Sequence, residues 1–338
     1  MSFSGDKNSK AKAAMKQAGS LMILGWEGTD LAEPLSLIEK YRPAGLIFFK
    51  RNYPPGGGEE LRLQLRTLQA RALEVMERPL LLAIDNEGGT VRRLPEPHLQ
   101  LPSASEAREL SLGDVFELSL NSARELNRLG FNLNLAPVAD LEVAGSFMGT
   151  RCYSGDPLEV AACVKVFVEG FRAAGVLCCA KHFPGLGAAN KDPHNDLPTV
   201  SLDKKQMQNH LKPFRELIQI NIPMVMTSHC RYPGVGVDAP ATFAPEIPAL
   251  LRREMNFEGL VLTDDLEMGA VSNEMDLGEA AVKAILAGHD AVLVCRKAEL
   301  IEKVHQALVD ALISQVIKTS QFIDIYGRLC SALDGLGS

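Results

Sequence analysis

The sequence predicts an α/β protein whose parallel strands close into a single (β/α)8 TIM-like barrel. Short apolar runs alternate with longer segments of helical periodicity along the chain. This alternation is typical of a parallel sheet with right-handed crossovers. The apolar runs number eight, and a chain of 338 residues suits a barrel of eight units. We therefore expect one domain over residues 1–338, with residues 1–18 as a polar N-terminal segment.

The predicted strands are short runs rich in aliphatic, β-branched and aromatic residues. In chain order they are 21–24, 45–49, 80–84, 132–136, 178–182, 224–227, 260–263 and 291–294. The predicted helices have apolar residues near a period of 3.6, as at Leu61, Leu65, Leu68 and Ala72. They are 33–41, 59–76, 115–129, 158–174, 204–219, 247–255, 277–287 and 299–312.

A doubly wound open sheet is the competing architecture. No Gly-x-Gly-x-x-Gly follows the first predicted strand, which argues against a dinucleotide-binding fold of that kind. The strand count favours the barrel.

Composition narrows the function further. The chain is 46% hydrophobic and 23% charged, with a formal net charge of −7, so it is a poor candidate for binding nucleic acid or an anionic membrane. We expect no membrane association, because the start lacks the apolar core of a signal peptide and no apolar run spans a bilayer. The seven cysteines are scattered, and Cys178 and Cys179 fit buried free thiols, so we expect a cytoplasmic protein.

Polar residues follow nearly every predicted strand. In order they are Lys50, Arg51 and Asn52; Asp85, Asn86 and Glu87; Asp140 and Glu142; Lys181 and His182; Ser228 and His229; Asp264 and Asp265; and Arg296 and Lys297. One such residue is usually the start of a solvated loop. In a barrel, however, all these strand ends meet at the face that carries active sites. Carboxylates, cations and imidazoles around one pocket suit a polyhydroxylated or charged ligand.

Five stretches resemble motifs of the β-N-acetylhexosaminidases of glycoside hydrolase family three. They are KHFPGLG at 181–187 with Asp192, Pro193 and His194; IDNEGG at 84–89 with Val91 and Arg93; NLNLAPV at 132–138 with Asp140; RCYSGDP at 151–157; and LTDDLEM at 262–268. They span most of the chain in the family's order and are most similar to the cytoplasmic branch that acts in peptidoglycan recycling. Two positions depart from the usual pattern. Leu186 stands where His is more frequent, and Pro193 stands where Ser or Thr is usual, which stiffens the loop.

The resemblance implies a retaining glycosidase in which Asp264 is the nucleophile. It also implies that His194 is the acid/base and that Asp192 orients it. Asp265 is the rival for the nucleophile, but neighbouring strand residues point to opposite faces, so we expect only one of the two in the pocket. The implied sugar-binding residues are Asp85, Arg151, Lys181 and His182, with weaker candidates at Arg51, Asn52, Asp140, His229 and Met268.

The implied activity is the release of terminal GlcNAc from peptidoglycan fragments, without a cofactor. A phosphorylase or another family three β-glycosidase on the same barrel is the alternative. A further alternative is a sugar-binding protein on an inactive barrel. The presence of Asp264, Asp192 and His194 argues against it. A metal-dependent hydrolase is the last, but the sequence has no HxH or HExxH spacing for a metal site.

Overall fold

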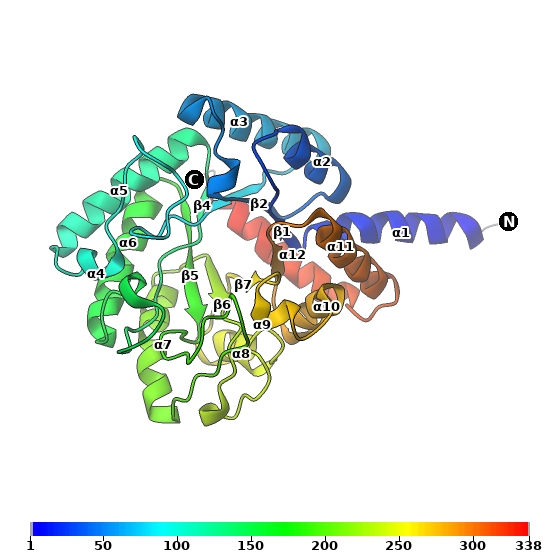
Figure 1. Cartoon of the computed structure of the whole chain (residues 1–338). Coiled ribbons are helices and arrows are strands. Elements are labelled where there is room, and N and C mark those ends of the chain that lie inside the picture. The colour runs from blue at the N-terminus through cyan, green and yellow to red at the C-terminus, as the bar shows by residue number, and fades with distance from the viewer. Residues whose placement is uncertain (1–2, 337–338) are drawn as a thin grey trace.

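The structure is a computed structural model and describes residues 3–336. Its eight parallel strands form a closed barrel in chain order, which confirms the predicted fold (Figure 1). The strands are β1 (Met22–Leu24), β2 (Gly45–Phe48), β3 (Leu81–Ile84), β4 (Leu133–Asn134), β5 (Leu177–Phe183), β6 (Met224–Thr227), β7 (Leu260–Asp265) and β8 (Ala291–Val294). Each predicted run overlaps one of these strands. β4 is shorter than expected, whereas β5 and β7 extend further into the residues of the expected site.

The predicted helices form the outer ring of the barrel (Figure 1). They are α2 (Ala32–Tyr41), α3 (Gly57–Met76), α5 (Leu112–Leu129), α6 (Pro157–Ala173), α7 (Lys204–Gln219), α10 (Leu277–Ala287) and α11 (Ala298–Ile313). The expected helix at 247–255 is instead α8 (Glu246–Ala249) followed by a π-helical turn, Leu250–Glu254.

Four helices of the described chain were not expected. They are α1 (Phe3–Gly19), α4 (Ala104–Ala107), α9 (Gly269–Ser272) and α12 (Thr319–Asp334). α4 and α9 are single turns, too short to show a period. Among residues 10–19 of α1, the buried side chains are those of Ala14 and Ala18, so the apolar pattern of this polar segment is weak.

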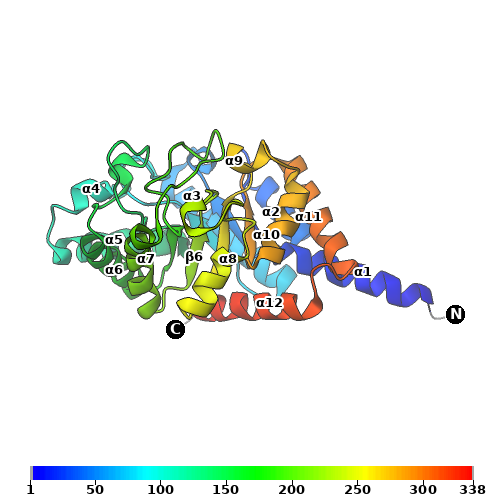
Figure 2. The same ribbon diagram turned by 90° about the horizontal axis from the view of Figure 1, so that it is seen from below.

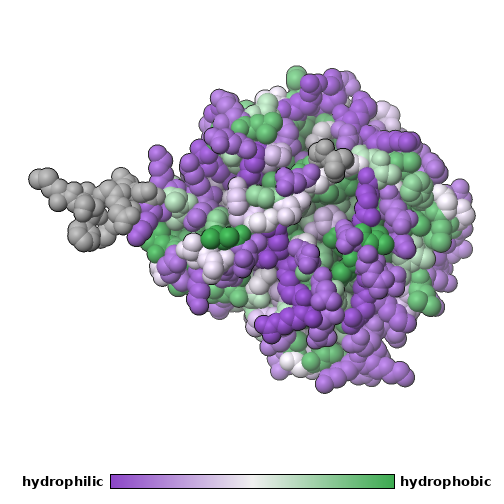
Figure 3. Space-filling model, turned by 180° about the vertical axis from the view of Figure 1, so that it is seen from behind, coloured by the Kyte–Doolittle hydropathy of each residue, from purple (hydrophilic) through white to green (hydrophobic). Residues whose placement is uncertain are grey.

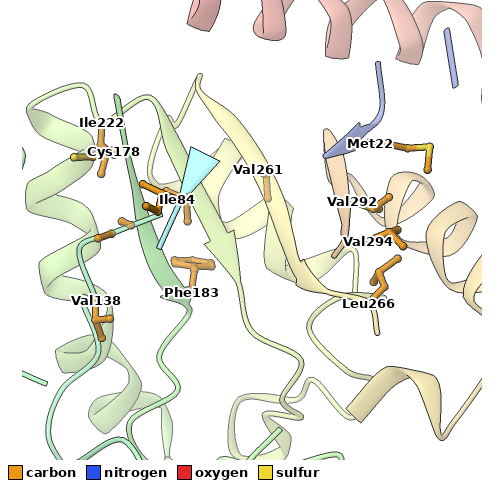
Figure 4. Packing of buried hydrophobic residues seen from close by; sticks show 14 of the residues in the cluster. Met22, Ile84, Val138, Cys178, Phe183, Ile222, Val261, Leu266, Val292 and Val294 are labelled. Carbon is orange, nitrogen blue, oxygen red and sulfur yellow. The ribbon is translucent and has the colours of Figure 1, made fainter. Parts of the chain in front are cut away.

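Side chains of the strands alternate between two packed layers, because successive residues of a strand point to opposite faces. Ile47, Ala83, Met226 and Leu262 belong to a cluster that fills the barrel. Their strand neighbours pack outward against the helices, and Figure 4 shows Val261, Val292 and Val294 in this outer layer. The barrel is therefore a packed core, which leaves its strand ends as the place for a site.

The helix α12 covers the N-terminal end of the barrel. Leu329 and Leu333 of α12 pack into the cluster that fills the barrel. Figure 2 shows α12 on the opposite side of the molecule from α9 and the long loops. Arg328 also donates to the buried carboxylate of Asp290, with its Nη2 2.7 Å from Oδ1. The long loops that follow the strands lie at the opposite end of the barrel (Figure 2).

The surface at the rear of the molecule is mainly hydrophilic with scattered apolar patches (Figure 3). Isolated apolar side chains on a surface are ordinary in globular proteins. Among the helices of residues 3–336, none is both long enough and apolar enough to cross a membrane.

Candidate active site

Lys181 lies at the centre of a buried cluster at the C-terminal end of the barrel. It is near the end of β5, and its Nζ lies 2.8 Å from Asp85 Oδ1 and 2.7 Å from Glu87 Oε1. Both carboxylates follow β3, two strands away. The side chain of Lys181 is only 4% exposed, so the cluster holds its charges in a poorly solvated place. Strand ends that are far apart in the sequence thus meet on one face, as we expected for Asp85 and Lys181.

Arg151 clamps the second carboxylate of this cluster. Its Nε and Nη2 both donate to Glu87 at 2.9 Å, in the two-pronged geometry that suits a guanidinium and a carboxylate. Burial alone raises a carboxyl pKa, but the charges of Lys181 and Arg151 outweigh it and hold the pKa of Glu87 at about 2. Glu87 is therefore ionised at neutral pH and has no proton to donate.

Asp85 is ionised for the same reason. Its burial opposes ionisation, yet Lys181 and Arg93 hold its pKa well below the ordinary value of an aspartate. Arg93 Nη2 lies 2.9 Å from Asp85 Oδ2, and the buried Nε of Arg93 has no hydrogen-bond partner within the described chain. Such a donor is costly unless it finds a partner, so it fits a ligand hydroxyl or a bound water. Arg93 lies within one of the five motifs, but no role was predicted for it, because its contact with Asp85 forms only in the fold.

One ring edge of His182 faces Arg151 of the cluster, and the other faces the buried Asp140. Its Nδ1 lies 2.7 Å from Asp140 Oδ2, and its Nε2 lies 3.5 Å from Arg151 Nη2. Asp140 is fully buried and also accepts the backbone N–H of Leu186 at 2.5 Å. Asp140 thus lies behind the imidazole and is closed off from solvent. It fixes the ring of His182 and the turn at Leu186.

Asp264 and Asp265 end β7 as a half-buried pair. Asp264 Oδ1 accepts the backbone N–H of Asp265 at 2.8 Å. Asp265 Oδ1 accepts the backbone N–H of Glu267 at 3.0 Å, and burial raises the pKa of Asp265 to about 7. A carboxylate must be ionised to attack an electrophile, so the environment of Asp265 is unfavourable for that role. Asp264 stays the predicted nucleophile of the pair.

His229, a weaker candidate, has both ring nitrogens engaged within the protein. Its Nδ1 lies 2.6 Å from the hydroxyl of Thr242, and its Nε2 donates to the backbone carbonyl of Asp265 at 3.0 Å. The ring is buried, and this burial lowers its pKa. A neutral imidazole in this position supports the end of β7 and leaves no free nitrogen for a sugar.

The other weaker candidates lie in the loops at the C-terminal end of the barrel. The Asn52 amide nitrogen donates to the carbonyls of Trp26 and Gly28, at 3.1 and 2.8 Å, and joins the loops after β1 and β2. Arg51 donates to the same Trp26 carbonyl at 2.9 Å and stacks over Phe49. Met268 is buried at the start of α9. The hydrogen-bonding groups of Asn52 and Arg51 are thus bonded to other parts of the protein.

Asp192 and His194 form a pair on an exposed loop after β5. Asp192 Oδ1 lies 2.7 Å from His194 Nδ1, so the pair forms with Pro193 between them. Partial burial opposes ionisation of Asp192, but the backbone and ring N–H of His194 hold its pKa below the usual value. The His194 side chain is 65% exposed, which leaves its Nε2 edge accessible. Among the described residues, no group of three or more His, Cys, Asp or Glu side chains is arranged to hold a metal ion.

Comparison with known proteins identifies the family. The model described as the N terminal domain of glycosyl hydrolase family 3 matches residues 17–329. The curated β-hexosaminidase of Xylella fastidiosa strain 9a5c is 34% identical over 328 residues, which is 94% of either chain. The β-hexosaminidase of Stenotrophomonas maltophilia strain R551-3 is 33% identical over the same length, again with 94% of both chains covered.

Solved structures agree with the sequence comparison. A family 3 β-N-acetylglucosaminidase from Paenibacillus sp. FPU-7 superposes with a TM-score of 0.91 at 34% identity. The match covers 96% of this chain but 62% of that longer enzyme. A β-N-acetylhexosaminidase from Beutenbergia cavernae has a TM-score of 0.84 at 26% identity, with 96% and 98% of the two chains covered. The barrel described above is thus that of a glycoside hydrolase, and the chain belongs to glycoside hydrolase family 3.

Proposed function

We propose that the protein is a retaining exo-β-N-acetylglucosaminidase. The observation that carries this proposal is the Asp192–His194 pair, on a loop at the barrel end that also holds Asp264 and the buried Lys181 cluster. The pair offers an imidazole to protonate a leaving oxygen, and Asp264 offers a carboxylate for covalent catalysis. The names of the relatives, β-hexosaminidase and β-N-acetylglucosaminidase, support this activity.

In the proposed reaction Asp264 attacks the anomeric carbon of the terminal sugar and forms a glycosyl-enzyme. His194 Nε2 gives its proton to the leaving oxygen and then removes a proton from the water that releases the sugar. Asp192, bonded to Nδ1, fixes the tautomer and stabilises the protonated ring. Two displacements at one carbon return the original anomeric configuration.

The buried cluster binds the sugar in this proposal. Asp85 supplies acceptors, while Lys181, Arg151 and Arg93 supply donors, and His182 adds its Nε2 edge. Because their mutual ion pairs already fix these groups, little order is lost when a sugar binds.

We further propose that the natural substrates are GlcNAc-terminated fragments of peptidoglycan, met in the cytoplasm. The support is the similarity of the five sequence motifs to the branch of the family that acts there.

The direct test compares hydrolysis of chromogenic β-GlcNAc and β-glucose glycosides. We expect turnover of the first and at most slow turnover of the second. A preference for glucosides contradicts the proposal, as does inversion at the anomeric carbon. Adding inorganic phosphate tests the phosphorylase alternative, because a phosphorylase releases a sugar phosphate in place of the free sugar.

A further inference from the structure

The loop of residues 190–199 rests on the short helix α9. The backbone N–H of Gly269 donates to the carbonyl of His194 at 3.1 Å, and that of Ala270 donates to the carbonyl of Pro193 at 3.0 Å. Met268, which precedes α9, provides no side-chain cap. The loop carbonyls therefore satisfy N–H groups that the start of a helix leaves without an internal partner.

The residue that follows α9, Asn273, adds a third contact to the same loop. Asn273 Nδ2 donates to the backbone carbonyl of Asn195 at 3.0 Å. Three consecutive loop carbonyls, those of Pro193, His194 and Asn195, thus accept hydrogen bonds from α9 and the residue that ends it. We call these three hydrogen bonds the latch. Asn273 is exposed, so its side chain contributes to this contact without filling the core.

The latch requires glycine at position 269. A Cβ atom there would lie 2.4 Å from the carbonyl oxygen of Asn195 and 2.8 Å from that of His194. Both are backbone atoms, so no side-chain rotation relieves the clash. The loop can lie this close to α9 only because residue 269 has no side chain.

The helix that holds the loop is also tied to the end of β7. Met268 donates its backbone N–H to the carbonyl of Asp265 at 3.1 Å, and the same carbonyl accepts Nε2–H of His229. The base of the loop is held separately by a bridge between Ala189 and Val200. One short segment, 264–273, therefore contains Asp264 and also positions the backbone that carries His194.

We propose that Gly269 and Asn273 are positioning residues for the acid/base. The latch sets how far His194 lies from the strand end that bears Asp264. This inference rests on the proposed function, since it assumes that His194 transfers the proton. Neither residue touches the substrate in this account; both act through the loop backbone.

The experiment uses Asn273→Ala, Asn273→Asp and Gly269→Ala in the full chain. Each variant is assayed with a β-GlcNAc glycoside of an activated phenol and with one of a simple alcohol. The first leaving group departs with little protonation, whereas the second requires an acid. The same variants are also made in a His194→Ala background. Hydrogen exchange of a peptide covering residues 190–197 reports the loop directly.

Loss of one hydrogen bond should reduce kcat/KM for the alkyl glycoside about three- to tenfold. The rate of glycosyl-enzyme formation from the aryl glycoside should change less than twofold. Asn273→Asp should be worse than Asn273→Ala, because a carboxylate oxygen then faces the Asn195 carbonyl. In the His194→Ala background none of these changes should reduce the rate further, since coupled residues give non-additive effects. Exchange in 190–197 should become faster in all three variants.

Glu274→Gln is the matched control, because Glu274 is the next residue, is exposed and forms none of the three contacts. Its kcat/KM for both glycosides and its hydrogen exchange in 190–197 should match those of the parent enzyme. The positioning role is wrong if the latch variants lower kcat/KM equally for both glycosides, or for neither. The proposed function still stands in that case, provided that His194→Ala lowers kcat/KM mainly for the alkyl glycoside. If His194→Ala itself shows no selectivity, the proposed function fails first.

Discussion

The buried ammonium of Lys181 determines the charge state of its neighbours. Two carboxylates within 2.8 Å of one ammonium, with Arg151 and Arg93 behind them, stay ionised although they are buried. Burial lowers the pKa of Lys181 and its two carboxylate neighbours raise it, with a net upward shift. The cluster is therefore a fixed set of charges across the neutral pH range, suited to binding rather than to proton transfer.

Glu87→Gln tests this interpretation. The substitution keeps the shape but removes the negative charge that balances Lys181 and Arg151. We expect kcat/KM to fall at least tenfold, by about the same factor for good and poor leaving groups, because binding geometry rather than acid catalysis is lost. Assays on both substrates check this. Glu142→Gln, at an exposed carboxylate nearby, is the control. A loss confined to poor leaving groups would instead make Glu87 the acid.

Substitutions of Asp264 and Asp265 should have clearly different effects on turnover. Asp264→Ala should reduce turnover by several orders of magnitude, because no other group forms the covalent intermediate. Asp265→Asn should be milder, since its side chain bonds the backbone of Glu267. Trapping with a slow fluorinated sugar, followed by peptide mass spectrometry, should label Asp264. Label on Asp265 reverses the assignment.

The sequence predicts these residues but not their partners. Asp85, Lys181 and Arg151 were expected to face a sugar, and the structure adds that they also face one another. The engagement of both ring nitrogens of His229 and the position of Asp140 behind His182 depend on tertiary contacts between distant strands. No spacing along the chain encodes such pairings.

At the scale of elements, the loop 190–199 carries the predicted acid/base pair, Asp192 and His194. Its described position, bonded to α9, needs the whole fold to bring segments near 194 and 269 together, so the sequence did not reveal it. The motif identified the Asp192–His194 pair because these two residues are close in the chain.

His194→Ala tests that pair. Substrates with poor leaving groups should lose far more activity than activated aryl glycosides, because only the former need a proton donor. Asp192→Ala should give a smaller loss with the same pattern, since Asp192 acts through the imidazole. Rates for a series of leaving groups provide the measurement. A uniform loss would show that His194 does something other than transfer a proton.

At the scale of the whole molecule, the barrel was predictable because each strand is a short apolar run between two helical segments. α12 was missed because the repeating pattern already ended with the eighth strand and its helix. Its partners are the interior residues at the bottom of the barrel, which only the closed sheet assembles.

Leu329→Ala measures what α12 contributes. Leu329 is 2% exposed against the barrel interior, so truncation should lower the free energy of unfolding by about 2–5 kcal/mol. KM should not change, because α12 lies at the far end from the loops. Ile323→Ala, at a position of the same helix that is 61% exposed, should cost less than about 0.5 kcal/mol. Urea titrations of both variants decide the matter; equal midpoints would mean that α12 is not part of the cooperative unit.

The position of α12 has a practical consequence. The last helix lies against the closed end of the barrel, away from the loops that surround the strand ends (Figure 2). A tether attached after α12 therefore leaves the C-terminal ends of the strands facing the surrounding liquid. On a solid support the protein can be immobilised through that end in one orientation, with each molecule still open to large, slowly diffusing glycans.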